Sequence, residues 1–162
     1  MLIKLDMKNA FDRVKLPFFY DVLLSFGFSL EFVNLIKACT NGPWITPLVN
    51  GRTFDFFKAS KGLRQGCPMS PFLYILMAEA LSRKLVVEKE ASYLPGIRIA
   101  RGMDPINHAL FADDSLLLGG ASMNIARAFN ETLLKFCQSF GALINKSKSV
   151  VYGWNVDQST IL

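Results

Sequence analysis

The chain has one histidine and only three cysteines among its 162 residues. The single histidine, His108, excludes metal sites built from several imidazoles, and we expect it to be an ordinary strand residue. Cys39, Cys67 and Cys137 are too widely spaced for a zinc motif, and their odd number does not suit a disulfide framework. This cysteine usage favours a reducing, intracellular setting.

The chain also lacks a long apolar run. Its most apolar stretch, residues 71–78, is followed at once by Glu79, and it is much shorter than the roughly 18 residues that a membrane-spanning helix requires. The acidic Asp6 close to the N-terminus does not fit the layout of a signal peptide. We therefore expect a protein that is neither secreted nor associated with a membrane.

Apolar and basic residues are abundant. Hydrophobic residues make up 51% of the chain and charged residues 19%, which excludes an intrinsically disordered protein and allows one domain with a real core. The net charge is +5 and the pI is about 9.2, which permits nucleic-acid binding without proving it. Lys58, Lys61 and Arg64 fall in a stretch with no acid between Asp55 and Glu79.

Hydrophobic periodicity and turn residues divide the chain into helices and strands. Helices are expected over residues 17–26, 30–39, 71–87 and 122–140. Strands are expected over residues 2–7, 44–49, 53–57, 96–100, 106–110, 115–118 and 149–152. Asn50 and Gly51 predict a tight hairpin turn, and Ser70 is expected to cap the third helix, which is apolar on nearly every side and therefore buried. This order predicts one α+β unit over residues 1–152, an antiparallel sheet with helices on one face, followed by an uninformative tail, residues 153–162.

Three carboxylates stand out by their positions. Asp113 and Asp114 lie at the tip of the hairpin expected around residues 106–118, and Asp6 lies at the end of the first strand, on the face away from its apolar side chains. Adjacent carboxylates repel each other, and a cation would relieve that repulsion. Aspartate is also common in turns that bind nothing. Two Mg²⁺ ions held by a few carboxylates can support an in-line phosphoryl displacement.

Four segments, in order, resemble the motifs of the reverse transcriptases of non-LTR (LINE-like) retrotransposons. Residues 5–14 resemble polymerase motif A, residues 62–71 motif B, residues 111–114 motif C and residues 141–149 motif D. Each match is weak by itself, and four matches in the right order are specific. The resemblance implies a polymerase palm fold and RNA-directed DNA polymerase activity.

The resemblance also implies roles for the carboxylates and for an aromatic residue. Asp6 and Asp113 would hold two Mg²⁺ ions, or Mn²⁺ in their place, with Asp114 beside them as the third carboxylate. Phe11, five residues after Asp6, matches the steric gate that excludes a 2′-hydroxyl. An ordinary core phenylalanine is the alternative for Phe11. Asp12 is expected to act as a cap or turn partner.

Motifs B and D contribute further candidates. Gln65 and Gly66 match the pair that contacts the nucleotide, and Arg64, with Lys61, suits phosphates. Lys148 matches the motif D lysine that protonates the leaving pyrophosphate. Lys146 is a rival for that role, and a solvated basic turn is the alternative for both lysines. Lys4 shares a strand face with Asp6 and is expected to hold that carboxylate or to touch phosphate.

The resemblance has gaps. The family's fingers region would precede motif A and its thumb would follow motif D, so we expect a palm core with the fingers mostly absent and the thumb absent. The implied partners are an RNA template, a DNA primer, dNTPs and the missing segments of a longer polyprotein, and the implied location is the nucleus. The alternatives are an inactive retrotransposon relic that at most binds nucleic acid, and an RNA-binding module of the RRM type. The latter predicts exposed aromatic residues where this chain has carboxylates.

Overall fold

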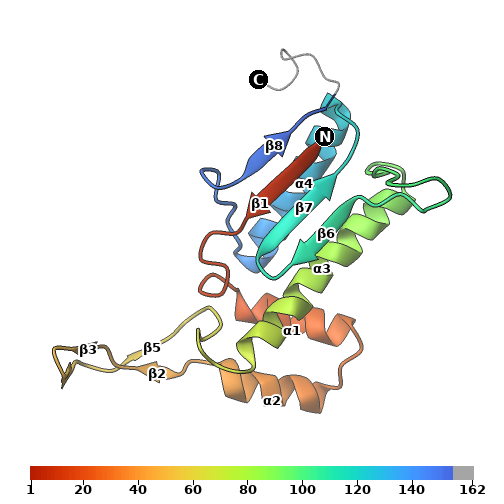
Figure 1. Ribbon diagram of the computed structural model, residues 1–162. Helices are drawn as coiled ribbons and strands as arrows, with labels where there is room; N and C mark the ends of the chain where they lie inside the picture. Colours follow the sequence, from red (N-terminus) through yellow and green to blue (C-terminus); the bar gives the residue numbers. More distant parts are fainter. Residues whose placement is uncertain (155–162) are drawn as a thin grey trace.

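The computed structural model describes residues 1–154, so most of the tail expected at residues 153–162 lies outside the described residues. A four-stranded antiparallel sheet forms the centre of the fold (Figure 1). Its strands, in spatial order, are β6 (His108–Phe111), β7 (Asp114–Leu118), β1 (Leu2–Asp6) and β8 (Val150–Tyr152). The first strand of the chain therefore lies inside the sheet, with β7 on one side and β8 on the other.

Helices pack on one face of this sheet. The helices are α1 (Leu16–Ser25), α2 (Leu30–Thr40), α3 (Ser70–Glu90) and α4 (Met123–Phe140). Figure 1 shows α4 behind the sheet and α3 running past β6, with α1 and α2 below. The predicted α+β architecture, an antiparallel sheet with helices on one face, is confirmed. None of the described helices has both the length and the hydropathy needed to cross a membrane.

Strand alternation decides which side chains face the helices. Leu5 in β1 and Leu117 in β7 are buried, whereas their neighbours Lys4 and Asp6 are only partly buried and lie on the other face. Phe19 of α1 and Phe129 of α4 are completely enclosed in the same core. Burying an aromatic side chain of this size stabilises the fold by about 2 kcal/mol.

Three helix ends are explained by the local sequence, and a fourth differs from the prediction made from it. Ser29 and Ser122 cap α2 and α4, since each side chain accepts a hydrogen bond from a backbone N–H of the first turn. Gly141 ends α4 in the left-handed conformation. The prediction that Ser70 caps α3 is wrong. Ser70 lies within the helix, and its hydroxyl donates 2.6 Å to the carbonyl of Arg64, which closes the preceding loop.

Two further expectations need correction. Helix α3 is not buried on every side, because the sheet and helices cover one face only and Phe72 and Ile75 are 68% and 58% exposed on the other. The strand expected at residues 96–100 is reduced to an isolated bridge between Ile97 and Ile106. Gly96 turns the chain with a positive φ beside Ile106, so a longer pairing does not develop.

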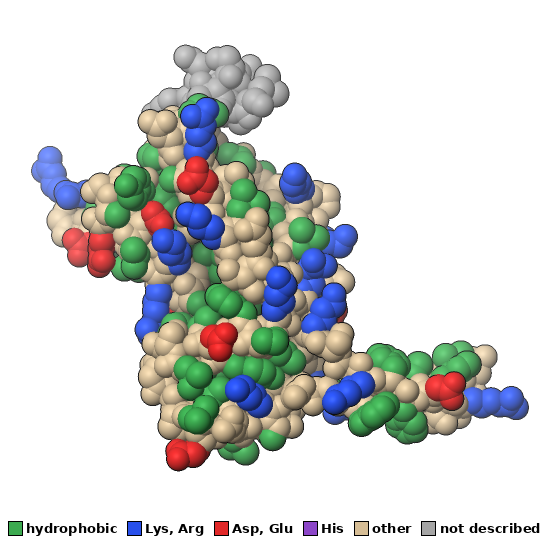
Figure 2. Space-filling view, turned by 180° about the vertical axis from the view of Figure 1, so that it is seen from behind, with side chains coloured by type: hydrophobic (Ala, Val, Ile, Leu, Met, Phe, Trp, Pro, Cys, Tyr) green, Lys and Arg blue, Asp and Glu red, His purple; other side chains and the backbone are tan. Residues whose placement is uncertain are grey.

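Residues 43–59 form a two-stranded arm that projects from the helices (Figures 1 and 2). Strands β2 (Trp44–Ile45) and β5 (Phe57–Lys58) pair at its base, and β3 (Leu48–Val49) and β4 (Arg52–Thr53) pair at its tip. The predicted Asn50-Gly51 turn is confirmed, with positive φ at both residues. Figure 2 shows hydrophobic side chains along this arm. Its base leads directly into the loop of residues 62–69 and so towards the candidate site.

Candidate active site

Two neighbouring strands bring the candidate carboxylates to the same end of the sheet. Asp6 is directly opposite Asp114 in the β1–β7 register. The β6–β7 hairpin pairs Phe111 with Asp114, so Ala112 and Asp113 form its tip, and Ala112 has a positive φ. The hairpin therefore carries Asp113 past the end of the paired strands, beside the end of β1.

A cleft of about 760 Å³ opens at this end of the sheet. Motifs A to D all contribute to its walls, which are lined by Asp6, Met7, Lys8, Asn9, Ala10, Phe11, Gln65, Gly66, Cys67, Pro68, Ser70, Pro71, Asp113, Asn145 and Lys148. Asp6 and Asp113, which are far apart in sequence, thus share one solvent-filled space. The motif D candidate in the cleft is Lys148, whereas Lys146 is not among the lining residues that the structure describes.

Asp114 is placed differently from the other two carboxylates. It is not among the described residues that line the cleft, and Lys4 Nζ lies 3.6 Å from its Oδ1. The expectation that Lys4 holds Asp6 is therefore wrong, because the cross-strand position of Lys4 beside Asp114 gives it another partner. Both side chains are nearly half exposed, so this ion pair contributes less than about 1 kcal/mol.

The donor atoms in the cleft suit a hard divalent cation. Mg²⁺ is usually held by one or two carboxylates together with substrate phosphates, and Asp6 and Asp113 offer such a pair. Within residues 1–154 no group of three or more His, Cys, Asp or Glu side chains is gathered closely enough to hold a metal ion. The carboxylates of Asp6 and Asp113 fit a Mg²⁺ ion that also binds substrate phosphates. A role for Asp114 as a third ligand stays a prediction.

Phe11 belongs to both the cleft and the core. Its half-buried ring lines the cleft and stacks on Tyr74, with ring centroids 4.8 Å apart. Burial and, to a smaller extent, the charge of Asp113 raise the pKa of Tyr74 to about 12. The phenol therefore stays neutral at physiological pH. The stacked ring of Tyr74 supports the ring of Phe11 at the cleft wall.

The motif B loop supplies the opposite wall. Gln65 and Gly66 line the cleft, and Arg64 and Lys61 line a second cavity of about 470 Å³ behind the loop. Gln65 borders both spaces. Its Nε2 donates 2.8 Å to Oδ1 of Asp12, so the carboxylate of Asp12 is the partner of a side chain on another loop.

Sequence reasoning missed Cys67 and Ser149. Cys67 lines the cleft, and a hydrogen bond with the backbone of Met69 is the main cause that lowers the pKa of its thiol. The hydroxyl of Ser149 accepts from the backbone N–H of Asp6 at 3.2 Å and donates to the carbonyl of Asn145 at 2.8 Å. The contact of Ser149 with Asp6 has no local signal, because it joins segments 143 residues apart, whereas Cys67 makes its contacts within its own loop.

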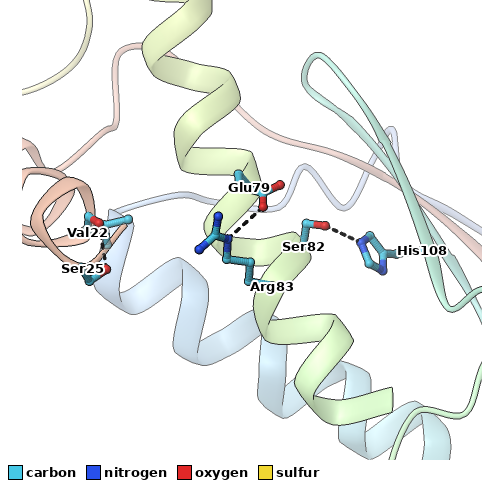
Figure 3. Close-up of polar contacts among 6 residues, drawn as sticks. All are labelled: Val22, Ser25, Glu79, Ser82, Arg83 and His108. Atoms are coloured by element: carbon cyan, nitrogen blue, oxygen red, sulfur yellow. Dashed lines mark hydrogen bonds and ion pairs between the residues drawn. The ribbon is translucent and has the colours of Figure 1, made fainter. Parts of the chain in front are cut away.

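His108 is a strand residue, as expected, and it is tied to α3. Its Nε2 lies 2.8 Å from the hydroxyl of Ser82 (Figure 3). Its Nδ1 lies 2.7 Å from Oδ1 of Asn107. Asn107 is buried and donates its Nδ2 to the carbonyls of Leu85 and Leu94. The amide oxygen of Asn107 therefore faces the histidine, which places the ring proton on Nδ1 and leaves Nε2 to accept from Ser82.

Comparison with known protein families identifies the family of this chain. The profile of a family described as "Reverse transcriptase (RNA-dependent DNA polymerase)" matches residues 1–158. The chain belongs to the reverse transcriptase family. By family, it is an RNA-directed DNA polymerase domain.

The relatives of this reverse transcriptase domain include retrotransposon proteins. It is 28% identical to the Pol polyprotein of the type-2 retrotransposable element R2DM of Drosophila melanogaster, over 94% of this chain and 14% of that protein. It is also 28% identical to the polyprotein of element R2 of Popillia japonica, over 91% of this chain and 23% of that protein. The predicted similarity to non-LTR retrotransposon enzymes is confirmed, and the chain spans less than a quarter of either polyprotein.

A shorter relative and a solved structure complete the comparison. An uncharacterized mitochondrial protein of Arabidopsis thaliana, AtMg01250, is 46% identical over 42% of this chain and 56% of its own length. The solved structure of telomerase from Candida albicans matches with a TM-score of 0.69 at 16% identity, covering 97% of this chain and 27% of that one. The structural match supports the fold of the reverse transcriptase domain and nothing finer.

Proposed function

We propose that this chain carries the catalytic centre of an RNA-directed DNA polymerase that joins dNTPs to a primer 3′-hydroxyl on an RNA template. The observation that carries this proposal is the convergence of Asp6, at the end of β1, and Asp113, at the tip of the β6–β7 hairpin, on one cleft. Phe11, Gln65 and Lys148 line the same cleft. These residues come from the segments that resemble motifs A to D, all of which lie within the residues that the family profile matches.

Each residue at the cleft has a separate task in this reaction. Asp6 and Asp113 would hold two Mg²⁺ ions, or Mn²⁺ in their place, which supply activation of the attacking hydroxyl and stabilisation of the leaving oxygen. Asp114 contributes as the third carboxylate of the same end of the sheet. The Nζ of Lys148 donates a proton to the leaving pyrophosphate, because an ammonium is a suitable acid for that oxygen.

The remaining side chains select and orient the nucleotide. The ring of Phe11 occupies the space that a 2′-hydroxyl would need, which favours deoxyribose. Gln65 and the backbone at Gly66 contact the nucleotide, since a residue without a Cβ allows close approach. Arg64 contacts phosphates from the far side of the loop.

The full reaction needs more of the polyprotein than this chain aligns with. Because the chain covers 14% of the Drosophila protein and 23% of the Popillia protein, we propose that primer extension by the chain alone is below detection. Fingers and thumb segments of a longer polyprotein would hold primer and template, and the reaction would take place in the nucleus. The same coverage leaves a second candidate, an inactive relic that at most binds nucleic acid.

Metal binding tests the site separately from the polymerase reaction. In ¹⁵N NMR spectra, Mn²⁺ should broaden the amide signals of residues at the ends of β1 and the β6–β7 hairpin. Asp113→Asn should abolish this selective broadening, because it removes one of two carboxylates that face the cleft. Asp104→Asn, in an exposed loop, is the matched control and should leave it unchanged. Broadening that is unselective, or that persists in Asp113→Asn, would contradict the site.

Catalysis has its own test. Single-nucleotide primer extension on an RNA template with Mg²⁺ should give no product with the isolated chain. Robust extension that Asp113→Asn abolishes would refute the proposed need for further segments and would also exclude the relic. Extension that survives Asp113→Asn would refute the assignment of the catalytic carboxylate.

A further inference from the structure

The loop of motif A and the loop of motif B are fastened to each other beside the cleft. The backbone N–H of Gly62 donates 2.9 Å to the carbonyl of Val14, and that of Leu63 donates 2.8 Å to the carbonyl of Phe11. A Cβ added to Gly62 would lie 2.7 Å from the carbonyl oxygen of Asp12, so the two backbones touch. Residues 11–14 and 62–65, here called the paired loops, are therefore joined through their backbones.

One hydrogen bond in the paired loops joins side chains rather than backbone. Gln65 Nε2 donates to Asp12 Oδ1 at 2.8 Å across a sequence separation of 53 residues. An ionised carboxylate only accepts hydrogen bonds, so the NH₂ end of the Gln65 carboxamide has to face Asp12. The opposite end, Oε1, accepts no hydrogen bond among the described residues, and Gln65 lines the cleft.

We propose that Asp12 is a positioning residue that sets the polarity of Gln65. By holding the NH₂ end of the carboxamide, it leaves the carbonyl oxygen of Gln65 as an acceptor for a hydrogen-bond donor of the nucleotide. This inference rests on the proposed function and deepens it, because it states which end of Gln65 the substrate meets. The chemical class recognised is therefore a nucleotide N–H or O–H group.

Asp12 has this effect because the carboxamide of a glutamine without a fixed partner can adopt two orientations. The terminal torsion of glutamine is broad and roughly two-fold, so rotation exchanges a donor for an acceptor at nearly the same place. The backbone bonds of the paired loops hold the position of Gln65, but they do not choose between these two orientations. Only the carboxylate makes the choice.

A charge exchange between the two positions tests the inference. In Gln65→Glu, the new carboxylate faces Asp12, and repulsion turns it away from its place. In the double variant Asp12→Asn/Gln65→Glu, the amide NH₂ of the new residue at position 12 donates to the new carboxylate, whose second oxygen still offers an acceptor to the nucleotide. The double variant therefore keeps an acceptor at position 65. It has no donor there, so binding that depended on the NH₂ group of Gln65 would not recover.

The readout is the dissociation constant of radiolabelled dTTP with Mg²⁺ and an RNA–DNA template–primer, measured by equilibrium dialysis with the 162-residue chain. Gln65→Glu should weaken binding about tenfold, the typical effect of one hydrogen bond to a charged or well-placed group. The double variant should recover most of this loss. Asp104→Asn/Gln65→Glu carries the same net charge change without the contact, and it should bind as weakly as Gln65→Glu.

The outcomes separate the inference from the function on which it rests. A double variant no better than Gln65→Glu, in a chain whose wild type binds dTTP, overturns the inference and leaves the proposed function standing. Recovery by the Asp104 control as well as by the double variant also overturns it, because net charge then explains the recovery. A folded wild type that binds no dTTP overturns the inference, because Gln65 then presents no acceptor that a nucleotide uses, whereas the selective Mn²⁺ broadening at Asp6 and Asp113 decides the proposed function separately. Thermal unfolding of the same variants verifies that each is folded and reports the side-chain contact without nucleotide.

Discussion

Replacing Gly62 by alanine should be among the most destabilising single-methyl changes in this domain. Gly62 has a φ of +86°, and an added Cβ would lie 2.7 Å from the oxygen and 2.9 Å from the carbon of the Asp12 carbonyl group. The left-handed conformation alone costs an alanine about 1–2 kcal/mol. Separating two backbones that already touch adds about 1–3 kcal/mol. Gly62→Ala should therefore lower the free energy of unfolding by about 3 kcal/mol.

Gly27 provides the matched control for this prediction. It has a φ of +89°, and nothing lies within 4 Å of the position of an added Cβ, so Gly27→Ala carries the conformational cost without the clash. Urea unfolding should show a loss of about 1–2 kcal/mol for this control and an unchanged m-value for both variants. Equal losses of unfolding free energy for Gly62→Ala and Gly27→Ala would refute the reasoning, because they would show that the paired loops can separate without destabilising the fold.

Three further changes test the site and its supports. Phe11→Ala should reduce the preference for binding dNTPs over NTPs by about tenfold or more, as expected when a tight pocket is opened; an unchanged ratio in the dialysis assay would remove its gate role. Ser149→Ala should cost about 1–2 kcal/mol in urea unfolding, because the backbone N–H of Asp6 loses its acceptor, and Ser149→Thr should restore most of that loss; equal losses would show that the hydroxyl is not the cause. Burial lowers the pKa of His108, against the smaller opposing effect of Glu79. As the pH falls below about 6.5, the imidazole is therefore protonated in the unfolded chain before it is protonated in the folded one, and the wild type should lose stability relative to His108→Gln. Parallel plots of unfolding free energy against pH for the two proteins would contradict this.

Local sequence predicted the elements of the fold well, because most of them depend on contacts between residues close in the chain. The alternation of Leu5 and Asp6, the serine cap at Ser122 and the Asn50-Gly51 turn are all decided within a few residues. The strand expected around Ile97 does not form, because Ile97 pairs with Ile106 through a single isolated bridge. Periodicity contains no information about the length of a pairing with a distant segment.

The site was only partly predictable for the same reason. Its position at a strand end made Asp6 stand out, but only resemblance to a family gave it a metal ion and separated Phe11 from an ordinary core phenylalanine. The contacts that hold the site were not predicted, since they join segments that are far apart in the chain. Asp6 meets Ser149 across 143 positions, and Gln65 meets Asp12 across 53. Such pairs become visible only when the sheet and loops are assembled.

The aspartates at the end of the sheet differ in whether they have a cationic partner. Three aspartates lie there, and among the ion pairs of residues 1–154 only Asp114 has a cationic partner, Lys4. The charges of Asp6 and Asp113 face the cleft without such compensation, beside a tyrosine that stays neutral. Carboxylates in one cleft repel each other, and Lys8 and Lys148, which line the same cleft, form no ion pair with either of them among the described residues. We propose that Asp6 and Asp113, which have no ion-pair partner among the described residues, bind the cations that the proposed reaction needs.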